Sequence, residues 1–103
     1  MVTFGERKGM VMKYGAYGLV EVVGDANGVI VTDRMLKTAD VEYVTKDTKC
    51  GGHVLIFMGG DVSAVTAAVE SVKNDPPCPV VQSAVVSNPS PEMVDIVETF
   101  RKR

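Results

Sequence analysis

Residues 54–61 read VLIFMGGD, a continuous apolar run followed by two glycines and an aspartate. An unbroken run of this length is typical of a central strand that is buried on both faces of a sheet. The glycines then predict a turn, and Asp61 is placed to cap a helix that follows. This passage from strand to helix sets the centre of the fold, and the neighbouring elements can be assigned outward from it.

Toward the N-terminus, two further strands and a helix precede this run. Strands are predicted over residues 14–24 (YGAYGLVEVVG) and 41–45 (VEYVT), because both stretches are rich in β-branched and aromatic residues. Between them, Asp25 is a candidate N-cap for a helix that extends to about Ala39. Residues 1–13 have no sustained period and are interpreted as an extension. The apolar face of the helix is predicted to contain Ala26, Val29, Ile30 and Leu36.

Toward the C-terminus, the pattern predicts two helices and one more strand. The helix after Asp61 has valines on one stripe with alanine and serine between them, which indicates close packing against another element. A last strand is predicted over residues 79–86, and Ser90 caps a final helix. The order β-α-β-β-α-β-α is the ferredoxin-like α/β (α+β) pattern with an added C-terminal helix. That pattern hosts many unrelated functions, so it does not decide the activity.

The composition is ordinary for one globular domain: 103 residues, 46% hydrophobic and 23% charged, with a net charge of -2. This charge argues against a nucleic-acid partner, because phosphate binding requires clustered Lys and Arg. No run approaches the roughly 20 apolar residues of a transmembrane helix, and the N-terminus lacks the features of a signal peptide. We therefore expect a cytoplasmic protein without a membrane partner, whose cysteines, Cys50 and Cys78, are reduced thiols.

Catalytic motifs are not apparent in the sequence. His53 is the only histidine, so no Ser-His-Asp arrangement can be assigned. The glycines before Asp61 lack the Lys and Ser/Thr that a phosphate-binding P-loop requires at fixed spacing. We therefore do not expect an enzyme.

The candidate site is the loop TKCGGH, residues 48–53. Cys50 stands beside Lys49 and two glycines, on backbone that can take positive φ and that lets another group approach closely. Because one chain offers a single thiol there, a thiolate cluster requires copies from several chains. The alternatives are a small buried cysteine, a C-x-x-H metal half-site with His53, and a redox nucleophile, for which no resolving cysteine is visible. Cys78, between two prolines, is expected to pack against the core.

Three stretches together resemble the shell domain of bacterial microcompartments, the BMC domain. YGLVEVVG (17–24) resembles the opening strand of the family, MLKTADVE (35–42) its passage from helix to strand, and GDVSAV (60–65) its turn into the second helix. The three stretches have the order and spacing of the family, and the resemblance extends over nearly the whole chain. We therefore assign residues 14–103 to a BMC shell domain and residues 1–13 to an N-terminal extension.

The resemblance implies a structural protein that forms flat homohexamers. Such hexamers tile a compartment shell together with other shell proteins, around encapsulated enzymes. Cyclic symmetry brings one loop from every subunit to the axis, where the loops surround a narrow pore for metabolites. By the resemblance, the pore-lining residues are Lys49, Cys50, Gly51 and Gly52.

Cys50 stands where the family usually has a small pore residue, commonly glycine. This departure is similar to shell proteins of the glycyl-radical type, in which a pore cysteine is associated with an iron–sulfur cluster. Thiolates are the standard ligands of such clusters, and four are normally used. We therefore hypothesise a 4Fe-4S cluster with Cys50 as its metal ligand at the hexamer pore. The competing interpretation is a cysteine-rimmed pore that only conducts.

Two residues are implied at the hexamer edge. Lys37 matches the family lysine that packs against its counterpart in the next hexamer. Asn88 stands where an arginine frequently assists edge contacts, and this departure puts tiling into flat sheets in question. A second class of protein also fits the pattern: a small ferredoxin-like regulatory or metal-binding protein, with Cys50 and His53 forming a metal site within a monomer or dimer.

Overall fold

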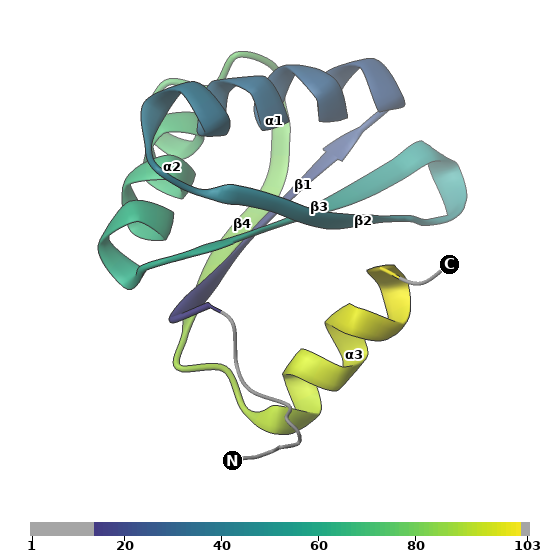
Figure 1. Ribbon diagram of the computed structural model, residues 1–103. Coiled ribbons are helices and arrows are strands. Elements are labelled where there is room, and N and C mark those ends of the chain that lie inside the picture. The colour runs from purple at the N-terminus through teal and green to yellow at the C-terminus, as the bar shows by residue number, and fades with distance from the viewer. Residues whose placement is uncertain (1–13, 102–103) are drawn as a thin grey trace.

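The computed structural model describes residues 14–101, and the extension assigned to residues 1–13 lies outside that part of the chain. The strands form one antiparallel sheet in the order β2-β3-β1-β4. The predicted order of elements and the ferredoxin-like sheet with an added helix are thus confirmed (Figure 1). The elements are β1 (Ala16–Val23), α1 (Asp25–Thr38), β2 (Glu42–Thr48), β3 (His53–Gly60), α2 (Val62–Asn74), β4 (Val80–Ser87) and α3 (Pro91–Arg101).

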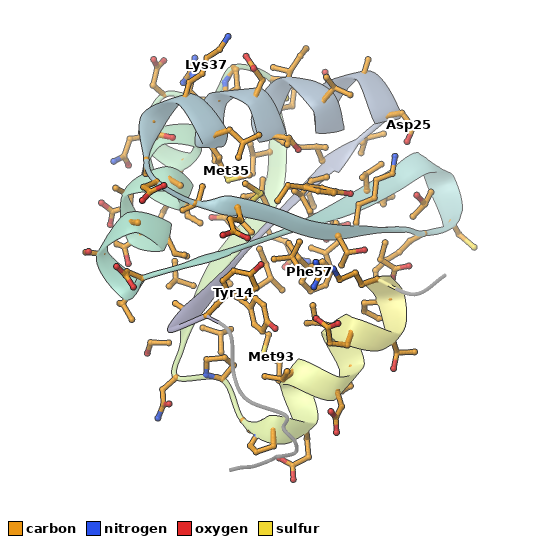
Figure 2. All side chains as sticks on the ribbon, in the orientation of Figure 1. Tyr14, Asp25, Met35, Lys37, Phe57 and Met93 are labelled. Carbon is orange, nitrogen blue, oxygen red and sulfur yellow. The ribbon has the colours of Figure 1, made fainter. Side chains whose placement is uncertain are left out.

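The sheet separates two cores. Helices α1 and α2 cover one face and α3 lies against the other, as Figure 1 shows. Figure 2 places Met35 between α1 and the sheet, and Tyr14, Phe57 and Met93 between the sheet and α3. The first core is built from apolar residues of β1, β3, α1 and α2, together with Val41. The second core contains Tyr14, Tyr17, Val44, Phe57 and Val97.

Strand β3 lies inside the sheet, between β1 and β2, and contributes to both cores. Ile56 and Met58 belong to the core under α1 and α2, whereas Phe57 belongs to the core under α3. All three side chains are at most 3% exposed. The unbroken apolar run that predicted a doubly buried central strand is therefore explained, since both of its faces require apolar residues.

Helix α1 turns a different face to the core from the one predicted. The sequence pattern put Ala26, Val29, Ile30 and Leu36 on one apolar face, but all four are exposed, the last three by 68%, 44% and 43%. Asp25 is also not the N-cap: Gly24 holds that position with φ 95°, and Asp25 is the first residue of the helix. The buried residues of α1 are Gly28, Val31 and Met35, which follow the helical spacing of three and four residues.

The other two helix starts agree better with the sequence. Asp61 holds the N-cap position of α2, although its side chain makes no capping hydrogen bond. At α3 the Ser90 hydroxyl accepts a hydrogen bond from the Met93 backbone N–H at 3.2 Å, as expected for an N-cap serine. Both residues therefore occupy the predicted N-cap positions, and Ser90 also makes the expected capping hydrogen bond.

Helix α2 packs directly on β1 at Gly18, as the small residues along the helix predicted. A Cβ atom added to Gly18 would lie 2.8 Å from Val69 Cγ2 and 2.9 Å from Val65 Cγ1. Both valines are buried in the core, with 3% exposure or less. Glycine at this position therefore lets the helix approach the strand without a clash.

Gly18→Ala is accordingly expected to destabilise the fold by about 1–3 kcal/mol, the usual cost of adding a methyl group to a packed core. Urea unfolding followed by circular dichroism measures the change. Gly15→Ala is the matched control, because the nearest atom to its added Cβ lies 3.7 Å away. Equal stability losses in the two variants would contradict the close packing of α2 on β1.

Candidate functional site

The candidate loop forms the tip of the β2–β3 hairpin. Cys50–Gly52 make a short 3-10 turn, in which Gly51 and Gly52 both have φ 78°. Residues other than glycine rarely adopt this left-handed backbone conformation, so the two glycines make the tight turn possible. Strand β2 extends to Thr48 rather than Thr45, which makes the loop shorter than the sequence indicated.

Two backbone hydrogen bonds fix this turn. The Lys49 N–H donates to the His53 carbonyl at 2.7 Å, which closes the hairpin. The Gly24 N–H donates to the Gly52 carbonyl at 2.8 Å, which ties the turn to the end of β1, where α1 begins. The hairpin tip therefore lies at the same end of the sheet as the N-terminus of α1 (Figure 1).

All four residues named as pore-lining from the resemblance are solvent-exposed in the single chain. Cys50 is an exposed free thiol, which excludes the alternative of a small buried cysteine. Cys78 is partly buried against the core, as expected, and its Sγ lies 3.9 Å from the Asn27 carbonyl. Burial raises the pKa of the Cys78 thiol, which favours its protonated, unreactive form. The two cysteines thus have different environments.

A polar cluster lies beside the hairpin, on the strand face opposite α1 and α2. The Gln82 side-chain amide donates to Glu21 Oε1 at 2.5 Å, and His53 Nδ1 lies 2.7 Å from Glu21 Oε2. An ionised carboxylate can only accept, so His53 Nδ1 carries the proton and donates it. The side chain of Glu21 is 11% exposed and that of His53 is 37% exposed. This cluster was not predicted, because its members lie on three different strands.

The hydrogen bonds from Gln82 and His53 lower the pKa of Glu21, and the positive charge of Lys49 acts in the same direction. A carboxyl group with a lower pKa in the folded state stabilises the fold above its ordinary pKa, and this contribution is lost as the pH falls through the lowered value. Glu21 therefore contributes to stability at neutral pH and stops doing so in acid.

Glu21→Gln is expected to remove this part of the acid dependence of stability. Urea unfolding at pH 6 and pH 3 measures it: the wild type loses more stability between the two values than the variant does, because glutamine does not titrate. Asp25→Asn is the control, since Asp25 is exposed and the Nζ of Lys46 lies 4.0 Å from its Oδ1. If the wild type and Glu21→Gln lose the same unfolding free energy between pH 6 and pH 3, the lowered pKa of Glu21 does not contribute to the acid dependence of stability.

The structure argues against Cys50 and His53 as a complete metal site within one chain. His53 Nδ1 is engaged by Glu21. Within residues 14–101, no three His, Cys, Asp or Glu side chains converge as a metal-binding group. Since tetrahedral sites need four ligands, a thiolate site at Cys50 requires additional ligands from other chains.

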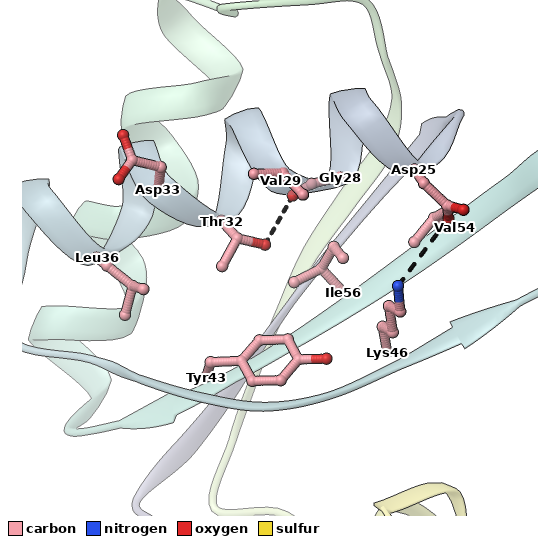
Figure 3. A pocket seen from close by; sticks show the side chains of 10 residues that line it. All are labelled: Asp25, Gly28, Val29, Thr32, Asp33, Leu36, Tyr43, Lys46, Val54 and Ile56. Atoms are coloured by element: carbon pink, nitrogen blue, oxygen red, sulfur yellow. Dashed lines mark hydrogen bonds and ion pairs between the residues drawn. The ribbon is translucent and has the colours of Figure 1, made fainter.

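A largely apolar groove of about 470 Å³ runs between α1 and the β2 edge of the sheet. Figure 3 shows α1 forming one wall, with Tyr43 of β2 opposite it. Lys46 Nζ approaches Asp25 Oδ1 to 4.0 Å at one end of the groove. The groove contains two of the side chains that were predicted to face the core, Val29 and Leu36. The lining residues are Asp25, Gly28, Val29, Thr32, Asp33, Leu36, Tyr43, Lys46, Val54 and Ile56.

The other edge of the sheet also exposes apolar side chains. Among residues 14–101, strand β4 pairs with β1 alone, so one side of it has no partner strand in that part of the chain. Val81 and Val85 on this strand are 51% and 37% exposed. Open strand edges of this kind are normally covered or blocked by charge. The chain therefore presents apolar surface at both edges of the sheet, but with different shapes.

The residues assigned to a hexamer edge lie at the opposite end of the molecule from the hairpin. Lys37 lies in the last turn of α1, points away from the sheet (Figure 2), and forms an ion pair with Asp33 at 2.9 Å. The Asn88 N–H donates to the Gly15 carbonyl, just before β1 begins, at 2.8 Å. Asn88 is exposed with φ 51°, a conformation that asparagine tolerates better than most residues.

This combination of a ferredoxin-like sheet, a third helix and a glycine-rich β2–β3 hairpin is matched by a known family. The BMC domain family profile matches residues 16–89, which is more than half of the chain. The chain therefore belongs to the BMC domain family, as the three sequence stretches indicated. This assignment also decides against an unrelated ferredoxin-like regulatory protein.

Individual relatives carry shell-protein names. Over 54 residues the chain is 41% identical to the bacterial microcompartment shell protein PduT of Citrobacter freundii, covering 52% of this chain and 29% of that protein. Over 63 residues it is 35% identical to the carboxysome shell protein CsoS1B of Hydrogenovibrio crunogenus, covering 60% of this chain and 65% of that protein. The matched segment thus spans less than two thirds of either relative.

A solved structure agrees with the fold. The crystal structure of a microcompartments protein from Desulfitobacterium hafniense DCB superposes with a TM-score of 0.70 at 30% sequence identity, covering 82% of this chain and 47% of that one. Within residues 14–101, no helix combines the length and apolarity that crossing a membrane requires.

Proposed function

We propose that this chain is a structural, non-catalytic building block of a bacterial microcompartment shell in the cytoplasm. Its copies assemble into a cyclic homohexamer with a central pore formed by the β2–β3 hairpins. Other shell proteins are its neighbours in the shell, and encapsulated enzymes lie behind it. Membership of the BMC domain family and the names of the relatives support the shell role.

The main support for a ring is that the two edges of the sheet differ. One edge carries the groove between α1 and β2, and the other carries the exposed valines of β4. Contact between two unlike patches is heterologous, and such contacts form closed rings when the rotation between copies closes. Burial of these side chains in a neighbouring copy also explains why α1 exposes Val29 and Leu36.

The direction of the hairpin supports a pore at its tip. Helix α1 begins beside the hairpin and ends at Thr38, next to Lys37, and its 14 residues span about 21 Å at 1.5 Å per residue. In the proposed ring, as the likeness to the BMC domain family suggests, the hairpin end faces the axis and the Lys37 end faces outward. Six copies of Lys49 and Cys50 then surround the pore, and Gly51 and Gly52 keep the loop narrow.

We further propose that the pore cysteines bind a 4Fe-4S cluster. An exposed thiol on a tight turn fits one ligand of such a cluster, and the chain supplies a single thiol there. Four thiolates are normally required, so copies of Cys50 from different subunits hold the cluster. When bound, the group supplies one-electron redox chemistry. The six-fold ring leaves two thiols in excess, so ligation is asymmetric.

Size-exclusion chromatography with light scattering tests the ring, which is expected at the mass of six chains of 11.0 kDa. A monomer or dimer at micromolar concentration would overturn it. Anaerobic purification followed by iron and sulfide assay tests the cluster separately. A hexamer that is free of iron and resists reconstitution would leave a cysteine-rimmed conducting pore in place of the cluster.

A further inference from the structure

A line of two hydrogen bonds links β4 to His53, which directly follows the turn that contains Cys50. It begins with the Gln82 amide on Glu21 Oε1 and continues with His53 Nδ1 on Glu21 Oε2. The other edge of the imidazole lies beside Gly51, because a Cβ added to that glycine would lie 3.4 Å from His53 Cδ2 and 3.9 Å from Nε2. The imidazole therefore stands between a fixed carboxylate and the backbone of the turn.

Glu21 is well suited to hold the imidazole in one orientation. Its side chain is 11% exposed, and each of its two carboxylate oxygens accepts a hydrogen bond from a different strand. Removing one donor from a buried carboxylate costs free energy, so the pair of donors is held firmly. Lys49 is the further charged side chain that acts on Glu21.

The turn itself needs such support. Gly51 and Gly52 can adopt many backbone conformations, so their φ of 78° is not favoured by the sequence alone. Two backbone hydrogen bonds, from Lys49 and from Gly24, tie the turn to the strands around it. The imidazole of His53 faces Gly51, and we expect it to limit the freedom of the turn and with it the direction of the neighbouring Cys50 side chain.

We infer that Glu21 and His53 are positioning residues for Cys50, and that Gln82 supports them by fixing Glu21. The three side chains of Glu21, His53 and Gln82 are called the clamp below. The inference deepens the proposed function in taking Cys50 as the functional group of the pore. The clamp itself lies within one chain, so its test does not depend on the ring.

The test compares Glu21→Ala and His53→Ala with the wild type. Amide hydrogen exchange across residues 48–53 reports the mobility of the turn. Its rate is expected to rise about ten-fold or more in both variants, as for the loss of a hydrogen bond to a charged group. The double variant is expected to show little further increase, because the two residues act as one unit.

Two further measurements separate positioning from general destabilisation. Glu21→Gln, which still accepts from His53, is expected to restore slow exchange of the turn when Gln82 turns its amide to match. Exchange of the β1–β3 ladder amides is expected to change less than that of the turn in every variant. Equal acceleration of the ladder and the turn, or a turn unaffected by both alanine variants, would overturn the inference.

Light scattering on the same samples keeps the two proposals apart. A wild-type protein that is not hexameric contradicts the proposed ring. In that case the exchange rates of the turn still show whether Glu21 and His53 position Cys50. Conversely, a hexameric wild type whose turn does not respond to either alanine variant contradicts the clamp alone. Asp95→Asn on the exposed side of α3, outside the turn and the groove, serves as the control, and it is expected to leave the exchange rate of the turn unchanged.

Discussion

Val81→Asp is expected to convert a hexamer into single chains of 11.0 kDa. Val81 lies on the edge strand β4 and is 51% exposed in the single chain. In the proposed ring it is buried against the groove of the next copy, where an unpaired carboxylate costs several kcal/mol. Because the same contact recurs six times, one substitution weakens every interface. Size-exclusion chromatography with light scattering gives the mass directly.

Ile96→Asp is the matched control for this variant. Ile96 is 55% exposed, close to the value for Val81, but it lies on α3 and belongs to neither edge of the sheet. Its substitution makes the same chemical change on the surface and is expected to leave the hexamer intact. A Val81→Asp protein that stays hexameric would place the ring contact elsewhere.

Val29→Asp changes the other side of the proposed contact and gives a sharper test. Val29 lines the groove and is 68% exposed, so its substitution is also expected to yield monomers. The Val81→Asp chain keeps an intact groove, and the Val29→Asp chain keeps an intact β4 edge. In an equimolar mixture these two intact surfaces can still pair with each other. The mixture is therefore expected to form dimers and no larger ring, whereas a two-fold symmetric contact gives no such pairing.

The sequence was sufficient for the elements that depend on local pattern. The apolar run at residues 54–58 identified the central strand, and glycine or proline marked most of the turns around it. Strand β2 was predicted too short, because the polar residues at its end resemble a loop. They are held in the strand by pairing with β3, where Thr48 lies opposite Val54. This pairing is a tertiary effect that local composition does not contain.

The face of α1 shows why a helical pattern can mislead in an assembling protein. Val29 and Leu36 are as apolar as core residues, and from the sequence they were assigned to the core. In the single chain they line a groove instead. Hydrophobic periodicity reports which residues avoid water, and it does not distinguish the core of one chain from a contact with another. The wrong assignment therefore identifies the candidate interface.

Part of the candidate site could be predicted from the sequence and part could not. The Cys50 turn was found from residue type alone, because a cysteine beside two glycines is chemically distinctive. The cluster around Glu21 was missed, since His53 lies 32 positions and Gln82 61 positions away along the chain. Only the strand register, which sets Glu21 opposite Gln82 and Val23 opposite His53, brings them together. No spacing rule in the sequence contains that register.

Cys50→Ser is expected to abolish bound iron and sulfide in anaerobically prepared protein while leaving the hexamer intact. Serine is close to cysteine in size, and Cys50 is exposed, so the substitution changes little in the packing of the chain. The hydroxyl is a poor replacement for thiolate, the standard ligand of iron–sulfur clusters. Since every subunit loses its only thiol at the pore, the expected loss of iron is complete.

Cys78→Ser provides the contrast, because Cys78 is the only other cysteine in the sequence. Its thiol is partly buried next to the core, 3.9 Å from the Asn27 carbonyl, and burial raises its pKa. It is therefore neither at the turn nor disposed to ionise, and its substitution is expected to leave the iron content unchanged. Iron retained by Cys50→Ser, or lost equally in both variants, would reject Cys50 as the ligand. Dissociation of the Cys50→Ser hexamer would instead assign this cysteine a role in packing between subunits.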